Sequence, residues 1–505
     1  MQDESAVPVR FSDVYVRMSL NCRYFGKVLA DEPFCMRKRQ CLLFGTIRRK
    51  SDSTIGSCHY FARCVIITLH IAGNDSDRPR KQDKDMKIKT KEMAYEDVLK
   101  LPRLKHKKPL KPQMWLASIV RLVCIPTLRK IGFTYISERM ELVKDQPCLI
   151  LMNHSSFTDM KLAFGIFYPK KLGIVTSVDA MSGFLGKLMR LLGCTPTHKY
   201  VTDLSLIRDI DYMLKKNKTS VLMYPEAGYS FDGCATAMPN HLGILMKRLG
   251  VPVVTVITQG AFHRDPLYNM LKIRDVRVSA HVKCIATAEE VKEKSVDELD
   301  ALLADAFSFD NFAWQRDNRV SVDVPFRADG LHRILYKCPN CATENRMEGK
   351  GVHLTCRACK KTWTMDEFGQ MKADDGETEF AHIPDWYKWE RECVKKEIED
   401  GAYCLDTDVE IAVQVNLDGV CKIGSGRLTH TPDGFRLVSV DGKLDYRQGP
   451  TFSHTLYSDF YWYEIGDVIG IGDNEFSYFC FPKENVSVSK ARLATEEIYK
   501  MKKQR

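Results

Sequence analysis

A histidine and an aspartate that stand five positions apart, His154 and Asp159, could together perform acid–base chemistry. They follow the apolar run LILM at residues 149–152, which is typical of a buried strand. Five residues of continuous helix rotate by about 500°, so the two side chains would face different ways within one helix. They can meet only if His154 precedes a helix whose first turn carries Asp159, with Ser155 or Ser156 as its N-cap.

A histidine held by a carboxylate is fixed in one tautomer and can take a proton from a hydroxyl or a water as a general base. A histidine at this spacing also occurs as an ordinary structural hydrogen-bonding residue, so the surrounding sequence has to decide between the two. Around the pair, apolar runs alternate with helix-like stretches, and this alternation predicts an α/β domain with a mostly parallel sheet. The predicted strands cover residues 147–152, 172–178, 220–225 and 251–260, and the predicted helices cover 159–167, 183–192, 203–215 and 240–249.

Polar residues collect where these predicted strands end. The segments NHSSFTD, GCTPTHK, YPEAGYS and VPVVTVI follow one another in this order along the chain. They resemble the four motifs of the glycerolipid acyltransferases, of the lysophosphatidate (1-acylglycerol-3-phosphate) acyltransferase type, over about residues 114–330. The resemblance implies that His154 deprotonates an acceptor hydroxyl and that Asp159 orients it. It also implies that the hydroxyl attacks the thioester of acyl-CoA or acyl carrier protein in phospholipid synthesis.

The second and third motifs depart from the common family pattern. Lys199 stands where the family usually has the arginine that binds the acceptor phosphate, so charge is kept and the bidentate fork is lost. Tyr229 stands at the arginine position of the third motif, which leaves the acceptor headgroup open: 1-acyl-sn-glycerol-3-phosphate or a related lysolipid. Four residues are expected to bind substrate by the resemblance: Lys199, Glu226, Gly228 and Ser230.

The chain has 18 cysteines and no signal peptide is evident in its sequence, which favours a reducing compartment. Two C-x-x-C pairs, separated by 14 residues, have the spacing of a zinc ribbon: Cys338, Cys341, Cys356 and Cys359. Four thiolates form a closed tetrahedral site, so we expect a structural Zn²⁺ that takes no part in acyl transfer. A redox pair or a disulfide is the alternative, and nucleic acid is not an expected partner.

With 505 residues the chain is long enough for two or three domains, and 44% hydrophobic residues exclude wholesale disorder. Residues 401–505 contain alternating runs separated by Asp-Gly turns, followed by a basic helix. This predicts a small antiparallel β domain capped by a C-terminal helix, similar in topology to pleckstrin-homology-like folds. The remaining divisions are a disordered or spurious extension at 1–85, the acyltransferase domain at 86–330, the zinc ribbon at 333–368 and a linker helix at 380–400.

The formal net charge of +10 is unevenly distributed, since KLPRLKHKKPLKP at residues 100–112 holds six Lys or Arg and no acid. The apolar run MWLASIVRLVCIPTL at 114–128 follows, and its helix is expected to stop at Pro126. The run is too short to span a bilayer, so these segments and Trp115 predict interfacial attachment to anionic lipid. A solvated linker and a core helix are the alternatives. The prediction places the protein in the cytoplasm, peripherally bound to the inner face of a membrane.

Two other functional classes remain open at this level. A non-catalytic lipid-binding scaffold would account for the tyrosine in the third motif, although it would not need both His154 and Asp159. A serine-dependent lipid hydrolase would use Ser155 or Ser156, although the chain lacks the G-x-S-x-G elbow that exposes such a nucleophile.

Overall fold

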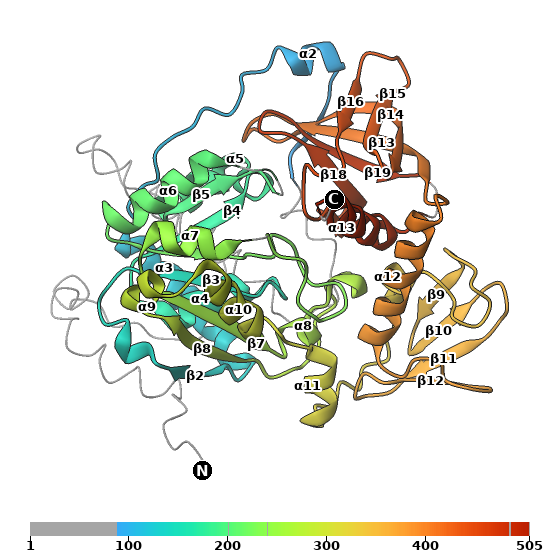
Figure 1. Ribbon diagram of the computed structural model, residues 1–505, viewed down its shortest axis with the longest axis horizontal. Helices are drawn as coiled ribbons and strands as arrows, with labels where there is room; N and C mark the ends of the chain where they lie inside the picture. Colours follow the sequence, from blue (N-terminus) through green and yellow to red (C-terminus); the bar gives the residue numbers. More distant parts are fainter. Residues whose placement is uncertain (1–87, 200, 202, 240, 484–485, 504–505) are drawn as a thin grey trace, which may run out of the picture.

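The computed structural model describes residues 88–199, 201, 203–239, 241–483 and 486–503. The extension predicted at residues 1–85 lies outside these described residues. Three β-sheets make up the described part, and helices cover or connect them (Figure 1). A seven-stranded sheet, formed by residues between 134 and 286, carries the four motifs.

The seven-stranded sheet is mostly parallel, as predicted. Its strand order is β2-β8-β7-β3-β6-β4-β5. The strands from β7 to β5 run parallel, whereas β8 is antiparallel to β7 and β2 is parallel to β8. The bounds are β2 (Thr134–Glu138), β3 (Leu149–Met152), β4 (Leu172–Ser177), β5 (Cys194–Thr197), β6 (Ser220–Met223), β7 (Val253–Gln259) and β8 (Ser279–Ala286).

Both faces of this sheet are covered, which explains why β3 is apolar at every position. Successive side chains of a strand point to opposite faces. Ile150 and Met152 belong to one buried cluster with α3 and α4, and Leu149 and Leu151 belong to another with α6, α7 and α10. The covering helices are α3 (Met114–Lys130), α4 (Asp159–Phe167), α5 (Gly183–Leu191), α6 (Leu204–Lys215), α7 (Leu242–Leu249), α9 (Ala288–Glu293) and α10 (Val296–Ala306).

Two local predictions about helix ends are wrong. Helix α3 does not stop at Pro126 but continues to Lys130. Pro126 leaves the carbonyl of Leu122 without its helical donor, and Leu122 is 58% exposed, so water can replace that donor. The N-cap position of α4 is Thr158, not Ser155 or Ser156, and the Thr158 side chain makes no capping hydrogen bond. The helix therefore begins at Asp159 itself.

The second sheet is antiparallel and small, with the order β12-β11-β10-β9, and it carries the four paired cysteines. Its strands are β9 (Met347–Lys350), β10 (His353–Cys356), β11 (Thr362–Met365) and β12 (Met371–Ala373). Helix α12 (Ile383–Glu399), where a linker helix was predicted, lies between this sheet and the C-terminal domain (Figure 1).

The third sheet has eight strands and forms the C-terminal β domain. Its order is β16-β15-β14-β13-β19-β18-β17, all antiparallel, with the short β1 (Thr90–Glu92) added in parallel to β14. The bounds are β13 (Leu405–Gln414), β14 (Val420–Thr431), β15 (Gly434–Ser439), β16 (Asp445–Gln448), β17 (Tyr457–Trp462), β18 (Gly466–Gly472) and β19 (Ser477–Pro482). Helix α13 (Val488–Lys503) packs on β17 and β18, so the antiparallel domain and its closing helix are confirmed. The pleckstrin-homology-like topology stays a prediction.

The C-terminal β domain packs against the acyltransferase motifs. Phe231, which follows the third motif, stacks on Phe460 of β17 with ring centroids 4.3 Å apart. His198 Nδ1 lies 3.3 Å from Ser477 Oγ of β19, and the Tyr457 hydroxyl donates to Asp179 Oδ2 at 3.1 Å. The second and third motifs therefore lie at an interface between two parts of the chain that are far apart in sequence.

Candidate active site

The first motif follows strand β3 directly, so it lies at the edge of the sheet where the parallel strands end. The buried Asn153 follows the strand, and its Oδ1 accepts from the backbone N–H of Thr258 at 2.8 Å while its Nδ2 donates to Ser155 Oγ at 3.0 Å. Asn153 thereby ties the exit of β3 to the end of β7. This connection fixes the backbone on which the next residue, His154, is presented.

The structure brings His154 and Asp159 together as the spacing required. His154 Nδ1 lies 2.8 Å from Asp159 Oδ2, and the same oxygen accepts from the backbone N–H groups of Ser155 and Ser156 at 3.0 and 3.1 Å. Asp159 is 1% exposed and stands at the first position of α4. A histidine that donates from Nδ1 to this carboxylate keeps Nε2 as a proton acceptor. Burial lowers the pKa of His154, and the hydrogen bond to Asp159 opposes that shift, so the imidazole is neutral near pH 7.

The third motif holds the backbone of His154 from both sides. Glu226 Oε2 accepts from the His154 N–H at 3.0 Å, and Glu226 Oε1 accepts from the Thr236 N–H at 2.7 Å. The Ser230 N–H donates to the His154 carbonyl at 3.0 Å, and the N–H of the buried Gly228 donates to the Glu226 carbonyl at 2.7 Å. Glu226 is fully buried, and burial raises its pKa to about 7. These residues fix the backbone of the segment that carries His154, and their role in substrate binding remains a prediction.

Two tyrosines of the third motif confine the imidazole ring. Tyr224 stacks on His154 with ring centroids 4.2 Å apart, and Tyr229 lies against it at 3.8 Å. Tyr229 in turn stacks on Phe157 at 5.1 Å. The His154 side chain is 17% exposed, so only an edge of the ring is open. Tyr229 stands where the family resemblance leads one to expect an arginine, and in this chain it packs on His154.

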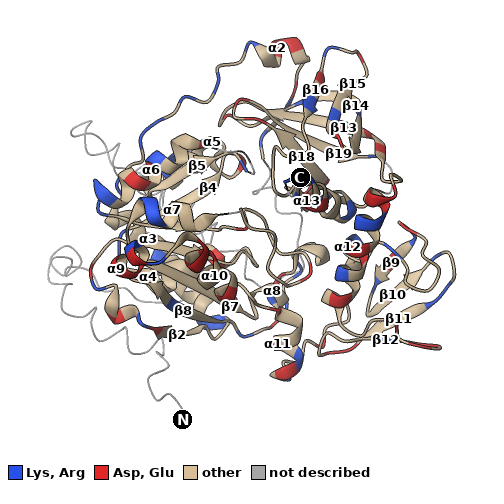
Figure 2. Ribbon diagram, viewed as in Figure 1, with Lys and Arg blue, Asp and Glu red and all other residues tan. Residues whose placement is uncertain are grey.

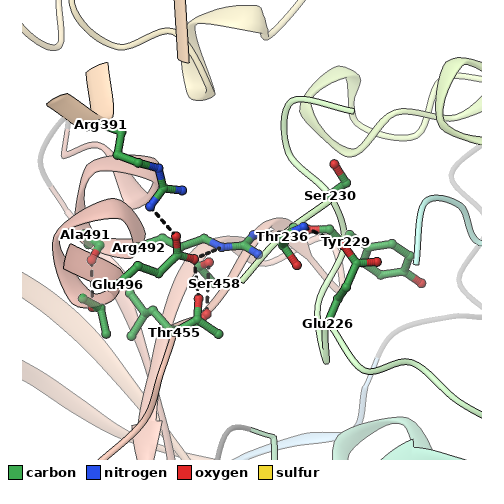
Figure 3. A network of polar contacts seen from close by, with 12 residues as sticks. Glu226, Tyr229, Ser230, Thr236, Arg391, Thr455, Ser458, Ala491, Arg492 and Glu496 are labelled. Carbon is green, nitrogen blue, oxygen red and sulfur yellow. Dashed lines mark hydrogen bonds and ion pairs between the residues drawn. The ribbon is translucent and has the colours of Figure 1, made fainter. Parts of the chain in front are cut away.

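A buried network from the C-terminal helix holds the third motif in place (Figure 3). Arg492 of α13 donates from Nη1 to the Tyr229 carbonyl at 3.2 Å, and its guanidinium lies 4.5 Å from the centre of the Phe231 ring. Arg492 Nε also pairs with Glu496 Oε1 at 3.3 Å, and Arg391 Nη1 pairs with Glu496 Oε2 at 2.7 Å. Sequence reasoning missed Arg492, because its contact with Tyr229 spans 263 positions and no local pattern marks it.

Lys199 lies two residues beyond β5 and does not join the His154 pair. Its Nζ lies over the Tyr457 ring, 4.3 Å from the ring centre. The positive charge of Lys199 still acts on His154, because it is one of the causes that lower the pKa of His154, after burial. The predicted acceptor-binding residue thus stands beside the C-terminal β domain.

The four cysteines of the second sheet could hold a metal ion. Their Sγ atoms all lie within 4.8 Å of one another, and the Sγ atoms are 3.7 Å apart in both the Cys338–Cys359 and Cys341–Cys356 pairs. Four sulfurs at about 2.3 Å from one Zn²⁺ in a tetrahedron are about 3.8 Å from each other. The thiols are too far apart for disulfides, which need about 2.05 Å. The donor set therefore fits a tetrahedral metal.

Comparison with known proteins concerns the part of the chain that contains the seven-stranded sheet. The family model described as Acyltransferase matches residues 134–259, which contain β2 to β7 and all four motifs. Among solved structures, the 1-acyl-sn-glycerophosphate (LPA) acyltransferase PlsC from Thermotoga maritima is similar at 16% sequence identity and a TM-score of 0.28, over 40% of this chain and 85% of that chain. No curated protein matches the chain. Residues 134–259 belong to the acyltransferase family, as the order of the four sequence motifs predicted.

Proposed function

We propose that the protein transfers a fatty acyl group from acyl-CoA or acyl carrier protein to a hydroxyl of a lysolipid, with His154 as the general base. The observation that supports this most directly is the 2.8 Å contact between His154 Nδ1 and Asp159 Oδ2, which leaves Nε2 to accept a proton. A binding module has no need of such a pair. The neutral state of the buried imidazole is the state that a base requires.

The reaction needs no covalent enzyme intermediate. The acceptor hydroxyl gives its proton to His154 Nε2 while its oxygen attacks the thioester carbonyl carbon. The new C–O ester bond forms, the C–S bond breaks, and the departing thiolate takes the proton from the imidazolium. Asp159 stabilises the imidazolium that exists between these two proton transfers, because its carboxylate contacts Nδ1. Tyr224 and Tyr229 hold the ring plane through both steps.

The arrangement of the neighbouring serines does not favour a serine hydrolase. Ser155 Oγ accepts from Asn153 Nδ2 at 3.0 Å, and Ser156 Oγ lies 2.7 Å from Thr158 Oγ1. Both serines are buried, at 4% and 1% exposure. A nucleophilic serine must lie within hydrogen-bonding reach of its base, and these hydroxyls are bonded elsewhere.

We further propose that Zn²⁺ is the metal of the four-cysteine site. The metal would join the two C-x-x-C pairs and stabilise the second sheet, and it would have no open coordination position for a substrate. Its role is structural, since the His154 site lies on another sheet.

Membrane attachment is also part of the proposal. No helix in the described part of the chain is long and apolar enough to cross a bilayer. The basic segment runs from α2 (Tyr95–Leu99) to α3, and Figure 2 shows its blue positions along the extended ribbon. Arg190 Nη2 donates to the Lys108 carbonyl at 2.7 Å, which places the segment beside α5. Trp115 and Phe184 are 47% and 43% exposed there, and such aromatic and basic residues suit the inner face of an anionic membrane.

The test is transfer of a labelled acyl group, with protein bound to anionic vesicles. Acyl-CoA and acyl carrier protein are offered separately as donors, and a panel of lysolipids is offered as acceptors. A new diacyl lipid, formed in proportion to the thiol released, supports acyl transfer. Release of free fatty acid without diacyl product would favour a hydrolase, and vesicle binding without turnover by folded protein would favour the lipid-binding scaffold.

A further inference from the structure

A cleft lies between the second motif and the C-terminal β domain, with an empty volume of about 500 Å³ when the open solvent at its mouth is included. Its walls include His198 and Lys199 after β5, Asp179 after β4, and Tyr457 and Asp473 of the β domain. The cleft is amphiphilic, since tyrosine and phenylalanine rings line it together with hydroxyl and amide side chains. It exists only because the two parts of the chain pack together.

The charges in this cleft are mixed. Of the described residues that line it, Lys199 is the only Lys or Arg, and Asp179 and Asp473 are the acids. Burial lowers the pKa of His198, so this ring adds no second positive charge near pH 7. A third carboxyl, Asp459, is buried on β17 beside Tyr457; burial raises its pKa to about 7, and the charge of Lys199 opposes that rise.

Each of the two lining carboxylates uses one oxygen within the protein. Asp179 is 7% exposed, and its Oδ2 accepts from the hydroxyls of Tyr457 at 3.1 Å and Tyr463 at 3.2 Å. Asp473 Oδ1 accepts from the N–H groups of Glu475 and Phe476 at 2.8 and 2.9 Å. Among the described residues, the hydrogen bonds of Asp179 and Asp473 use one oxygen each, and a cationic group could donate to the other oxygen of each carboxylate.

The single cation, Lys199, lines the cleft and also acts electrostatically on His154. Lys199 Nζ lies 4.3 Å from the centre of the Tyr457 ring, which lines the cleft, and its charge is felt at His154. A phosphate that contacts Lys199 would therefore lie in the same cleft as the two aspartates. A phosphate monoester, with up to two negative charges, would meet one cation and two carboxylates, and like charges at such range repel.

We propose that this cleft binds the headgroup of a zwitterionic lysophospholipid, with the phosphodiester at Lys199 and the ammonium group between Asp179 and Asp473. The phosphodiester carries one negative charge, which one lysine matches, and the ammonium can donate to the other oxygen of each carboxylate. The inference rests on the proposed acyl transfer, and it names the acceptor class of that reaction. Tyr229 agrees with this proposal. It stands at the arginine position of the third motif, so a phosphate monoester would find no second cation at that position.

The test compares four lysolipids that share one acyl chain and one glycerol backbone. Their headgroups are a phosphate monoester, a phosphodiester with an ethanolamine amine, a phosphodiester with an uncharged glycerol, and none. For wild type, kcat/KM for the amine-bearing acceptor is expected to be at least about tenfold higher than kcat/KM for each of the other three lysolipids. One hydrogen bond between charged groups is expected to have about this effect. Asp179→Asn and Asp473→Asn are each expected to raise KM for that acceptor about tenfold and to leave kcat and the glycerol phosphodiester nearly unchanged.

Equilibrium binding to the His154→Ala protein separates this inference from the proposed reaction. The same lysolipids, in short-chain form below their critical micelle concentration, should bind with the same order of affinities. The matched control is Asp433→Asn, because Asp433 is 94% exposed on the same domain and should leave the order unchanged. If the protein turns over none of the acceptors but binds the amine-bearing lipid selectively, the proposed reaction is refuted and the cleft assignment stands. Preference for the phosphate monoester, or binding that does not distinguish the headgroups, would overturn the cleft assignment.

Discussion

Replacement of Arg492 by methionine should damage both stability and catalysis, because the buried guanidinium joins the C-terminal helix to the third motif. The side chain is 3% exposed, pairs with Glu496 and donates to the Tyr229 carbonyl. Removal of one member of a buried ion pair costs about 3–5 kcal/mol. Arg391 still pairs with Glu496 at 2.7 Å in the variant. We therefore expect the free energy of unfolding to decrease by about 3 kcal/mol, the low end of this range.

The effect on catalysis follows from the lost hydrogen bond to Tyr229. A hydrogen bond from a charged donor contributes about 1.5–3 kcal/mol, and each 1.4 kcal/mol lost from transition-state stabilisation is about tenfold in rate. Tyr229 packs on the His154 ring, so a displaced loop releases the base. We expect kcat to fall between about 10-fold and 100-fold with KM nearly constant. Arg492→Lys keeps the charge beside Glu496 and should recover much of the stability but little of the rate, since it loses the guanidinium fork.

The assays are denaturant unfolding and steady-state kinetics on the same preparations, at a temperature where every variant is folded. Lys502→Met is the matched control, because Lys502 lies on the same helix, is 35% exposed and pairs with Asp433, which is 94% exposed. It should change stability by less than about 1 kcal/mol. A folded Arg492→Met protein with wild-type kcat would refute the claim that the C-terminal helix positions the third motif.

Three further predictions concern titration and the metal. Because burial lowers the pKa of His154 and the base must be neutral, kcat/KM should rise with pH through an apparent pKa below about 6.5 and stay level above it; a titration above pH 7 would contradict this assignment. The folded-state pKa of Glu226, about 7, exceeds the unfolded value of about 4.3, so its stabilising contribution, about 4 kcal/mol, should be present below pH 4 and lost as pH rises through 7. Glu226→Gln should flatten this part of the pH–stability curve, and an unchanged curve would speak against a buried, titrating carboxyl. Cys338→Ser should abolish stoichiometric zinc measured by mass spectrometry and lower the melting temperature, whereas full zinc content in the variant would refute the four-cysteine site.

The sequence predicted much of the central sheet because its signals are local. The apolar runs at β3, β4, β6 and β7 mark strands that are buried on both faces, and such strands read as continuous hydrophobic segments. Strand β5 contains a proline and only four residues, and β2 is partly exposed, so neither has a comparable pattern. The antiparallel edge of the sheet was missed because β8 alternates half-buried and buried positions over much of its length and β2 is partly exposed, so neither forms a continuous apolar run.

The sequence predicted the residue pairs of the two sites, but it did not predict the side chains that pack around them. The spacing of His154 and Asp159 is enough to restrict how they meet, and the two C-x-x-C pairs identify a metal-binding cluster by chemistry alone. The departure at Tyr229 was visible in the sequence, but its contact with His154 was not, because stacking depends on the path of the loop. The contacts from Arg492 and Tyr457 cross more than 250 positions, and no periodicity encodes a contact of that range.

The most direct test of the central claim is the rate of acyl transfer by His154→Ala relative to wild type, on vesicles and with saturating donor and acceptor. His241→Ala is the control, since that ring is 65% exposed and lies outside the site. If His154 is the base, its replacement should lower kcat by at least about a hundredfold, in line with general-base catalysis, while the control and the fold remain as in wild type. Transfer at the wild-type rate by a folded His154→Ala protein would contradict the account.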